Sequence, residues 1–226
     1  MERMTYSIHL IKLFTSREDH LFKLNEAERL KNVWNLLFFL LGLTILTYVW
    51  TAWLGLGTDA ISANMSDLNR VEYEMRKAWF LLGRAGFAIL LFLFTLFISS
   101  FFFWLFNNVS YKKLFILQMN VLLIMLIERI TWIPLMVYAG IDWYVSPFSF
   151  GVIASYFTSI DWVIYLCGAI SIFQLFIIWY QVKCISWLSK TKIGWIWVGV
   201  VFWHMLLWAG TAALSKFDLY LLYLLR

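Results

Sequence analysis

The sequence predicts an all-α fold: a polytopic membrane helix bundle of five transmembrane helices with an N-terminal amphipathic helix. Of the 226 residues, 63% are hydrophobic and only 14% are charged, whereas soluble domains carry roughly 25% charged residues. Long runs without charge recur along the chain, and Lys and Arg gather beside their ends. Because so apolar a chain has too little polar surface to cover itself in water, lipid must surround most of it.

Five segments are long enough to cross a bilayer of about 30 Å at about 1.5 Å per residue. We place these spans at about 33–54, 79–106, 114–138, 162–182 and 193–214. They form one transmembrane domain, 33–226, preceded by a cytoplasmic segment, 1–32. The remaining residues 215–226 are apolar but too short to cross and predict an interfacial tail.

The N-terminal segment carries the pattern of a surface helix. Ser16 is the expected N-cap, with Asp19 as its capping-box partner. Apolar residues then recur at about every third position, at Leu21, Leu24, Ala27 and Leu30, with charges between them. This pattern predicts an amphipathic helix that lies on the membrane surface or packs beneath the bundle.

Charged residues inside the predicted spans are few. Arg84 lies in a Gly-Arg-Ala-Gly stretch that predicts a break near the start of the second span, where its side chain can snorkel to the interface. Glu128 and Arg129 lie deep in the third span, and Pro134 follows within two turns. A charged pair at that depth is costly unless it faces other helices or water.

The stretch that leads into the fourth span contains the turn residues Pro147 and Phe148. We expect 140–159 to dip back into the interface before that span begins. The longest polar loop, 58–77, lies between the first two spans, and its last part can extend the second helix out of the membrane.

The distribution of basic residues predicts the orientation. With the N-terminus inside, the cytoplasmic segments hold eleven Lys and Arg and the outer segments hold five. Cytoplasmic loops are enriched in these residues. We therefore predict a cytoplasmic N-terminus and an external C-terminus in a bacterial plasma membrane. The same placement of basic residues beside spans, without a basic block, argues against nucleic-acid binding.

The candidate functional residues are Glu128, Arg129, His204 and Arg84. His204 lies in the fifth span at a depth similar to that of Glu128, so the two could meet across the bundle. A structural polar link is favoured over a proton- or ligand-handling site. Adjacent helical residues point about 100° apart, so Glu128 and Arg129 are not expected to face one partner.

Enzyme motifs are absent from the sequence. It contains no HExxH zinc motif, no GxSxG nucleophile elbow and no Gly-rich phosphate loop. The residues around His20 could bind a metal, but a solvated helix start is the favoured interpretation. We therefore expect no catalytic residues, no cofactor and no metal.

Three stretches carry a family resemblance: the amphipathic lead-in, the Ser-Pro-Phe-Ser turn followed by Asp161-Trp162, and the last helical pair joined by a short basic loop, Lys183 to Lys192. In these stretches the layout resembles the Yip (YIPF) family of membrane proteins in its bacterial form. It implies a five-helix, non-enzymatic integral membrane protein. In size and layout the chain is similar to the YknW type, which accompanies an ABC exporter in defence against a toxic peptide.

Two functional hypotheses follow. The favoured one is a scaffold or accessory subunit whose partner is an integral membrane protein, namely an ABC permease or fusion subunit. The alternative is a small transporter, channel or lipid-handling protein that uses the intramembrane polar residues. Membrane lipids surround the protein in both, and self-association into a homo-oligomer is left open.

Overall fold

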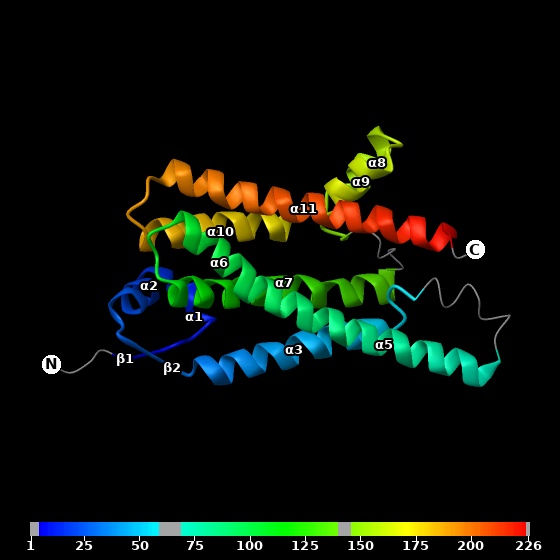
Figure 1. The fold of residues 1–226 in the computed structure, drawn as a ribbon, viewed down its shortest axis with the longest axis horizontal. Coiled ribbons are helices and arrows are strands. Elements are labelled where there is room, and N and C mark those ends of the chain that lie inside the picture. The colour runs from blue at the N-terminus through cyan, green and yellow to red at the C-terminus, as the bar shows by residue number, and fades with distance from the viewer. Residues whose placement is uncertain (1–4, 59–68, 140–145, 225–226) are drawn as a thin grey trace. The chain divides into compact units, whose positions relative to one another are not determined.

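The computed structural model describes residues 5–58, 69–139 and 146–224, which are mostly helical (Figure 1). The chain divides into two compact units. The first comprises the chain up to Ile130 together with Trp187–Lys190, and the second comprises Thr131–Ser186 and the chain from Thr191 onward.

The first unit begins with a small N-terminal head, which we define as residues 5–31. Its elements are β1 (Thr5–Ser7), α1 (Lys12–Thr15), α2 (Arg17–Glu26) and β2 (Arg29–Lys31). The two strands pair in parallel, with Tyr6 opposite Leu30. Buried apolar side chains from the loop after β1 and from both helices make a common core: Ile8, Leu10, Leu13, Leu21 and Leu24.

The prediction of one amphipathic helix that runs from Ser16 through Leu30 is wrong. Ser16 is the N-cap residue of α2, but its hydroxyl donates back to the Lys12 carbonyl at 3.3 Å and makes no capping bond. The helix ends at Glu26, and Leu30 belongs to a strand. The lead-in is therefore a short helix inside a folded head. A position of this helix at the membrane surface stays a prediction.

The first predicted span is confirmed as a helix by α3 (Val33–Trp53). Its buried face carries threonines, and its outer face carries large apolar side chains such as Phe38 and Trp50. Thr44 and Thr47 donate to the carbonyls of Leu40 and Leu43, at 2.6 and 2.8 Å. The hydroxyls of these small side chains are thus hydrogen-bonded within their own helix. Small side chains let α3 pack closely on the next helix, α5.

The second span is longer than predicted and is not broken at Arg84. It consists of α5 (Arg70–Leu93), a π-helical turn η2 (Phe94–Ile98) and α6 (Ser99–Phe106). The first turn is fixed by a capping box between Asn69 and Glu72, so the helix begins well before the apolar run. These 37 residues extend about 55 Å, which exceeds the bilayer core. The end of the predicted loop 58–77 therefore belongs to this helix; 59–68 lie outside the described residues.

The interruption of the second span is the π turn. One extra residue in this turn shifts the register of the helix and frees backbone groups. The Tyr111 hydroxyl lies 3.4 Å from the Phe97 carbonyl, and the rings of Phe97 and Phe115 lie 5.2 Å apart. Both contacts join the turn to the start of the next helix, α7.

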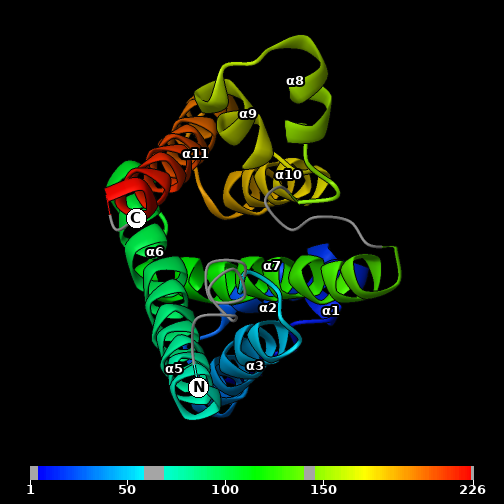
Figure 2. The same ribbon diagram turned by 90° about the vertical axis from the view of Figure 1, so that its right-hand side faces the viewer.

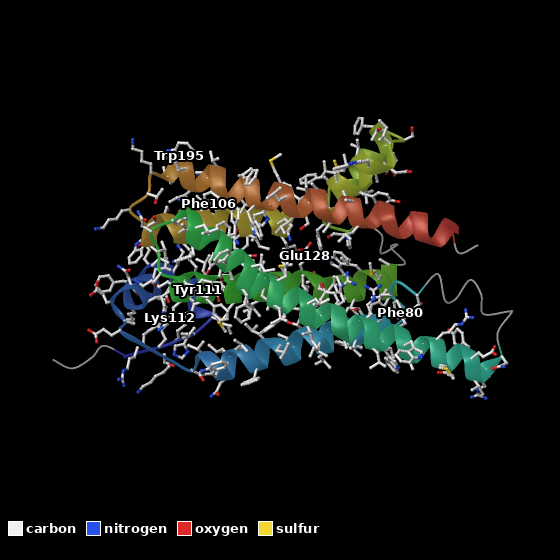
Figure 3. All side chains as sticks on the ribbon, viewed as in Figure 1. Phe80, Phe106, Tyr111, Lys112, Glu128 and Trp195 are labelled. Atoms are coloured by element: carbon white, nitrogen blue, oxygen red, sulfur yellow. The ribbon has the colours of Figure 1, made fainter. Side chains whose placement is uncertain are left out.

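The third predicted span is confirmed as a helix by α7 (Tyr111–Ala139), which contains Pro134 within its length. Neighbouring groups can satisfy the backbone carbonyl that a proline leaves without a donor, so prolines are tolerated in membrane helices. The boundary between the two units falls at Ile130–Thr131, one turn before this proline. Figure 3 shows Glu128 along α7, with Tyr111 and Lys112 at its start and Phe80 toward the far end of the first unit.

The second unit corrects the prediction of a continuous fourth span at 162–182. The elements are α8 (Gly151–Phe157), α9 (Asp161–Gly168), α10 (Ile172–Leu188) and α11 (Ile193–Leu224). The chain from 162 to 182 is thus divided between α9 and α10, with a break at 169–171. Helix α9 packs against both α8 and α11 (Figure 2). The C-terminal residues expected as a tail continue α11 as far as Leu224.

The turn predicted at Pro147 and Phe148 is present and holds the helix break. The Ser149 N–H donates to the Ser146 carbonyl at 2.9 Å, which closes the turn. Ser149 pairs with Ser171 in an antiparallel bridge, and the N–H groups of Phe150 and Ile172 donate across it at 3.0 and 3.1 Å. Backbone groups in a membrane must be satisfied within the protein. The turn therefore supplies partners for the backbone that the break frees. The first part of the predicted dip, 140–145, lies outside the described residues.

Replacing Ser171 by Ala is expected to destabilise the start of α10. The buried Ser171 hydroxyl oxygen accepts from the Gln174 N–H at 3.1 Å and so caps this helix. Loss of such a cap costs about 0.5–2 kcal/mol. Faster hydrogen exchange at 172–175 would show it. Ser155→Ala, which removes an exposed hydroxyl bonded to the Val152 carbonyl, is the control. Equal exchange in both variants would contradict the capping role.

Four helices in the described part of the chain are long and apolar enough to cross a membrane. They are Val33–Trp53, Arg70–Phe106, Tyr111–Ala139 and Ile193–Leu214. With 17 residues, α10 is shorter than a usual span. The chain is therefore a helical protein with multiple membrane-spanning helices, and the count of five spans is not confirmed.

Candidate functional site

Three helices of the first unit bring polar side chains together. Tyr48 comes from α3, Arg84 from α5, and Glu128 and Arg129 from α7. The Arg129 guanidinium carbon lies 5.3 Å from the centre of the Tyr48 ring, in cation–π geometry. Arg84 and Glu128 also lie close enough to the Tyr48 hydroxyl for their charges to act on it. We call these four residues the arginine cluster.

The members of the arginine cluster differ in exposure. Glu128 is 7% exposed, whereas Arg84 and Arg129 are half-buried. The Arg84 guanidinium also lies over the Phe80 ring, 4.8 Å from its centre. The low exposure of Glu128 means that its side chain lies inside the first unit. The arrangement also shows that Arg84 and Arg129 belong to one cluster, which the sequence did not indicate.

Exposed tryptophans lie near the arginine cluster in sequence. Tyr48 precedes Trp53 by five residues, and Arg84 follows Trp79 by five residues, which corresponds to about 7 Å along each helix. Both tryptophans are exposed, as is Trp50, one turn before Trp53 in α3. Tryptophans of this kind mark the membrane–water interface. We therefore expect the arginine cluster to lie about one to two helical turns below one membrane face.

The second unit contains another buried polar pair. His204 on α11 is 3% exposed, and its Nε2–H donates to Gln181 Oε1 on α10 at 2.9 Å. Gln181 is buried as well. The rings of His204 and Trp208 lie 5.9 Å apart, one turn along the same helix. This bond joins two helices in the apolar interior of the unit.

The expected contact between Glu128 and His204 stays a prediction because the two residues lie in different units. Sequence reasoning missed two residues that the structure places against the candidates: Tyr48, which contacts Arg129, and Gln181, which contacts His204. A polar amide in the apolar run of 172–188 was a usable signal for Gln181. Tyr48 gave none, because a tyrosine near a span end is ordinary in a membrane protein.

The head contains a buried tyrosine–histidine pair. His20 is 8% exposed, and its Nδ1 lies 2.6 Å from the Tyr6 hydroxyl. The His9 ring contacts His20 edge-on, with ring centres 6.5 Å apart. Burial lowers the pKa of His20, and the nearby charges of Lys23 and Lys12 lower it further. Neutral His20 accepts the hydrogen bond that the Tyr6 phenol donates.

Acidification below the usual histidine pKa of about 6.5 is expected to destabilise the head. Because the pKa of His20 is lowered on folding, the unfolded head binds the proton more readily. The stabilisation is complete above the unfolded pKa and is lost as pH falls toward the folded pKa. Hydrogen exchange across 5–31, corrected for intrinsic rates, should accelerate between pH 7.5 and 5.5. His20→Asn should flatten this dependence and exposed His9→Gln should retain it; an equal profile in all three proteins would contradict it.

The head is fixed to the start of α7. The Lys113 ammonium donates to the carbonyl and the side-chain oxygen of Asn25, at 3.1 and 2.6 Å. Asn25 lies in the last turn of α2, so a cation meets the carbonyl end of that helix. This contact places the head at the end of the first unit opposite the arginine cluster.

The suggested metal site around His20 receives no support from the arrangement. His20 points into the head toward Tyr6, whereas Glu18 and Asp19 are exposed. Within residues 5–58, 69–139 and 146–224, no group of three His, Cys, Asp or Glu side chains could hold a metal ion.

No family model, curated protein sequence or solved structure matches this chain.

Proposed function

We propose that the chain is a non-catalytic accessory subunit or scaffold of a membrane complex. The observation that supports this proposal most is that polar side chains inside the helices contact side chains of neighbouring helices. Arg129 on α7 lies against Tyr48 on α3, and His204 on α11 bonds to Gln181 on α10. Polar groups joined from helix to helix are typical of a packed bundle, whereas a transport path requires such groups to face water.

The head supports the same proposal. It has a core of its own, and it also exposes two large apolar side chains, Ile11 and Phe22, the latter 56% exposed. Exposed apolar groups on a folded surface outside the spans favour contact with a partner or with the membrane surface. With the N-terminus cytoplasmic, as the basic residues predict, this surface would face a cytoplasmic or membrane-embedded subunit.

The Yip (YIPF) resemblance makes the proposal more specific. If the chain is a bacterial member of the YknW type, its partner is an ABC permease or fusion subunit, in an exporter that protects against a toxic peptide. The resemblance rests on layout and on the Ser-Pro-Phe-Ser turn. In this chain the turn has a structural role, because it holds the break before α10.

Crosslinking in native membranes, followed by gentle purification and mass spectrometry, tests the proposal. We expect a membrane-transporter subunit in stoichiometric amount from the unaltered protein. Recovery should fall at least fivefold with Ile11→Ser combined with Phe22→Ser. Glu18→Ser combined with Glu26→Ser, at exposed positions on the same head, is the matched control. Purification without any partner, together with transport by the purified protein alone, would contradict the proposal.

A further inference from the structure

We propose that the arginine cluster binds the phosphate of an anionic phospholipid headgroup, with Arg84 and Arg129 as the phosphate ligands. This site is independent of the proposed partner, because it lies at the end of the first unit opposite the head. The ligand class is a phosphate-bearing anion, and the membrane is its expected source.

The charges of the cluster favour an anion. Arg84 and Arg129 interact electrostatically with each other as well as with Tyr48, and Glu128 is the acidic group that acts on both Arg129 and Tyr48. Two guanidinium groups and one carboxylate leave a formal charge of +1 near Tyr48. Net charge inside a bilayer is costly. A singly charged phosphate diester would bring the site to neutrality.

The position of the cluster fits a lipid headgroup. The neighbouring tryptophans place it about one to two turns below the interface. Long arginine side chains can cover that distance by snorkelling, and both arginines are half-buried, so each retains an exposed part. Lipid phosphates lie at the level that these side chains reach.

The residue types fit phosphate better than a simple halide. A guanidinium presents a planar fork of donors that matches two phosphate oxygens. Here two forks come from different helices, α5 and α7, so one phosphate would join them. The cation–π contacts with Phe80 and Tyr48 hold the guanidinium groups near the apolar surface. A headgroup bound there would be clamped between the two helices.

Native mass spectrometry of the delipidated full-length protein tests this site. The probes are phosphatidylglycerol, phosphatidylcholine and inorganic phosphate, each titrated separately. We expect phosphatidylglycerol to bind at least tenfold more tightly than phosphatidylcholine. Arg84→Gln and Arg129→Gln should each weaken phosphatidylglycerol binding about tenfold, because hydrogen bonds to charged groups contribute about that much. Arg76→Gln, at an exposed position on the same helix α5, should leave binding unchanged.

The alternative outcomes are distinct. Equal binding of phosphatidylglycerol to all four proteins would overturn the site, as would the absence of any preference over phosphatidylcholine. Arginine-dependent binding of inorganic phosphate without lipid binding would overturn the membrane source. Circular dichroism and gel filtration check folding. If a glutamine variant does not fold, Arg129→Lys and Arg84→Lys are measured in its place. Lysine keeps the positive charge but lacks the planar set of donors that binds two phosphate oxygens. An unaltered affinity for phosphatidylglycerol in both lysine variants would overturn phosphate coordination by the arginines.

Discussion

Replacing Leu21 by Ala is expected to unfold the N-terminal head while the membrane helices remain folded. Leu21 is 1% exposed and lies in the head's core with Leu24 and Leu13. Leu-to-Ala changes at such sites cost about 2–5 kcal/mol. A unit of fewer than about 40 residues has little stability to lose. The change should therefore remove most of the free energy that keeps the head folded.

Hydrogen exchange measured by mass spectrometry would show this result. Peptides from 5–31 should lose their protection in the variant, while peptides from α3 and α7 should keep theirs. Phe22→Ala removes a large side chain from the neighbouring position, but this side chain is mostly exposed, so protection should stay near that of the unaltered protein. Preserved protection in Leu21→Ala would show that the head is held by its attachment to α7 and not by its own core.

The spans were predictable because their signal is local. A run of apolar residues without charge has one stable environment, and 33–54, 114–138 and 193–214 all correspond to helices. Their ends were less predictable. Asn69 and Glu72 begin α5 far outside the apolar run by capping it. The Asn-x-x-Glu pattern was present in the sequence and would have placed this start correctly.

The break between α9 and α10 could not be read from hydropathy. The run from 162 to 182 contains no charged residue, and its interruption depends on the pairing of Ser171 with Ser149, a residue that precedes α8. Hydropathy carries no information about such a contact. The head was missed for the same reason, because β1 and β2 pair across more than twenty residues and each is too short to show a strand period.

The sequence identified the candidate polar residues, but it did not predict which residues they contact. Glu128, Arg129, His204 and Arg84 stood out because charged or polar groups are costly in a bilayer. Which neighbour each one meets depends on how each helix is rotated about its axis, as where Tyr48 of α3 faces Arg129 of α7. The sequence does not encode such rotations in any local pattern.

Replacing Gln181 by Leu is expected to destabilise the second unit by about 1–3 kcal/mol. The change leaves the His204 Nε2–H buried without its acceptor, and an unsatisfied buried donor carries that cost. His204→Phe should also be destabilising, because it removes the donor that Gln181 accepts from. Combining both changes removes the two polar groups together. The double variant should therefore be more stable than the sum of the single effects allows.

A double-mutant cycle in mixed detergent, with unfolding followed by circular dichroism, measures this coupling. Coupling energies of polar pairs in membrane proteins average about 0.6 kcal/mol and reach about 1.7, because groups in the unfolded state also find partners within the membrane. We expect a value in the upper part of this range, since both residues are buried. Gln174→Leu makes the same change at a less buried position on α10 and should cost little. A coupling near zero would mean that the bond contributes no stability, and His204 would then be better explained as a ligand- or proton-handling group than as a structural link.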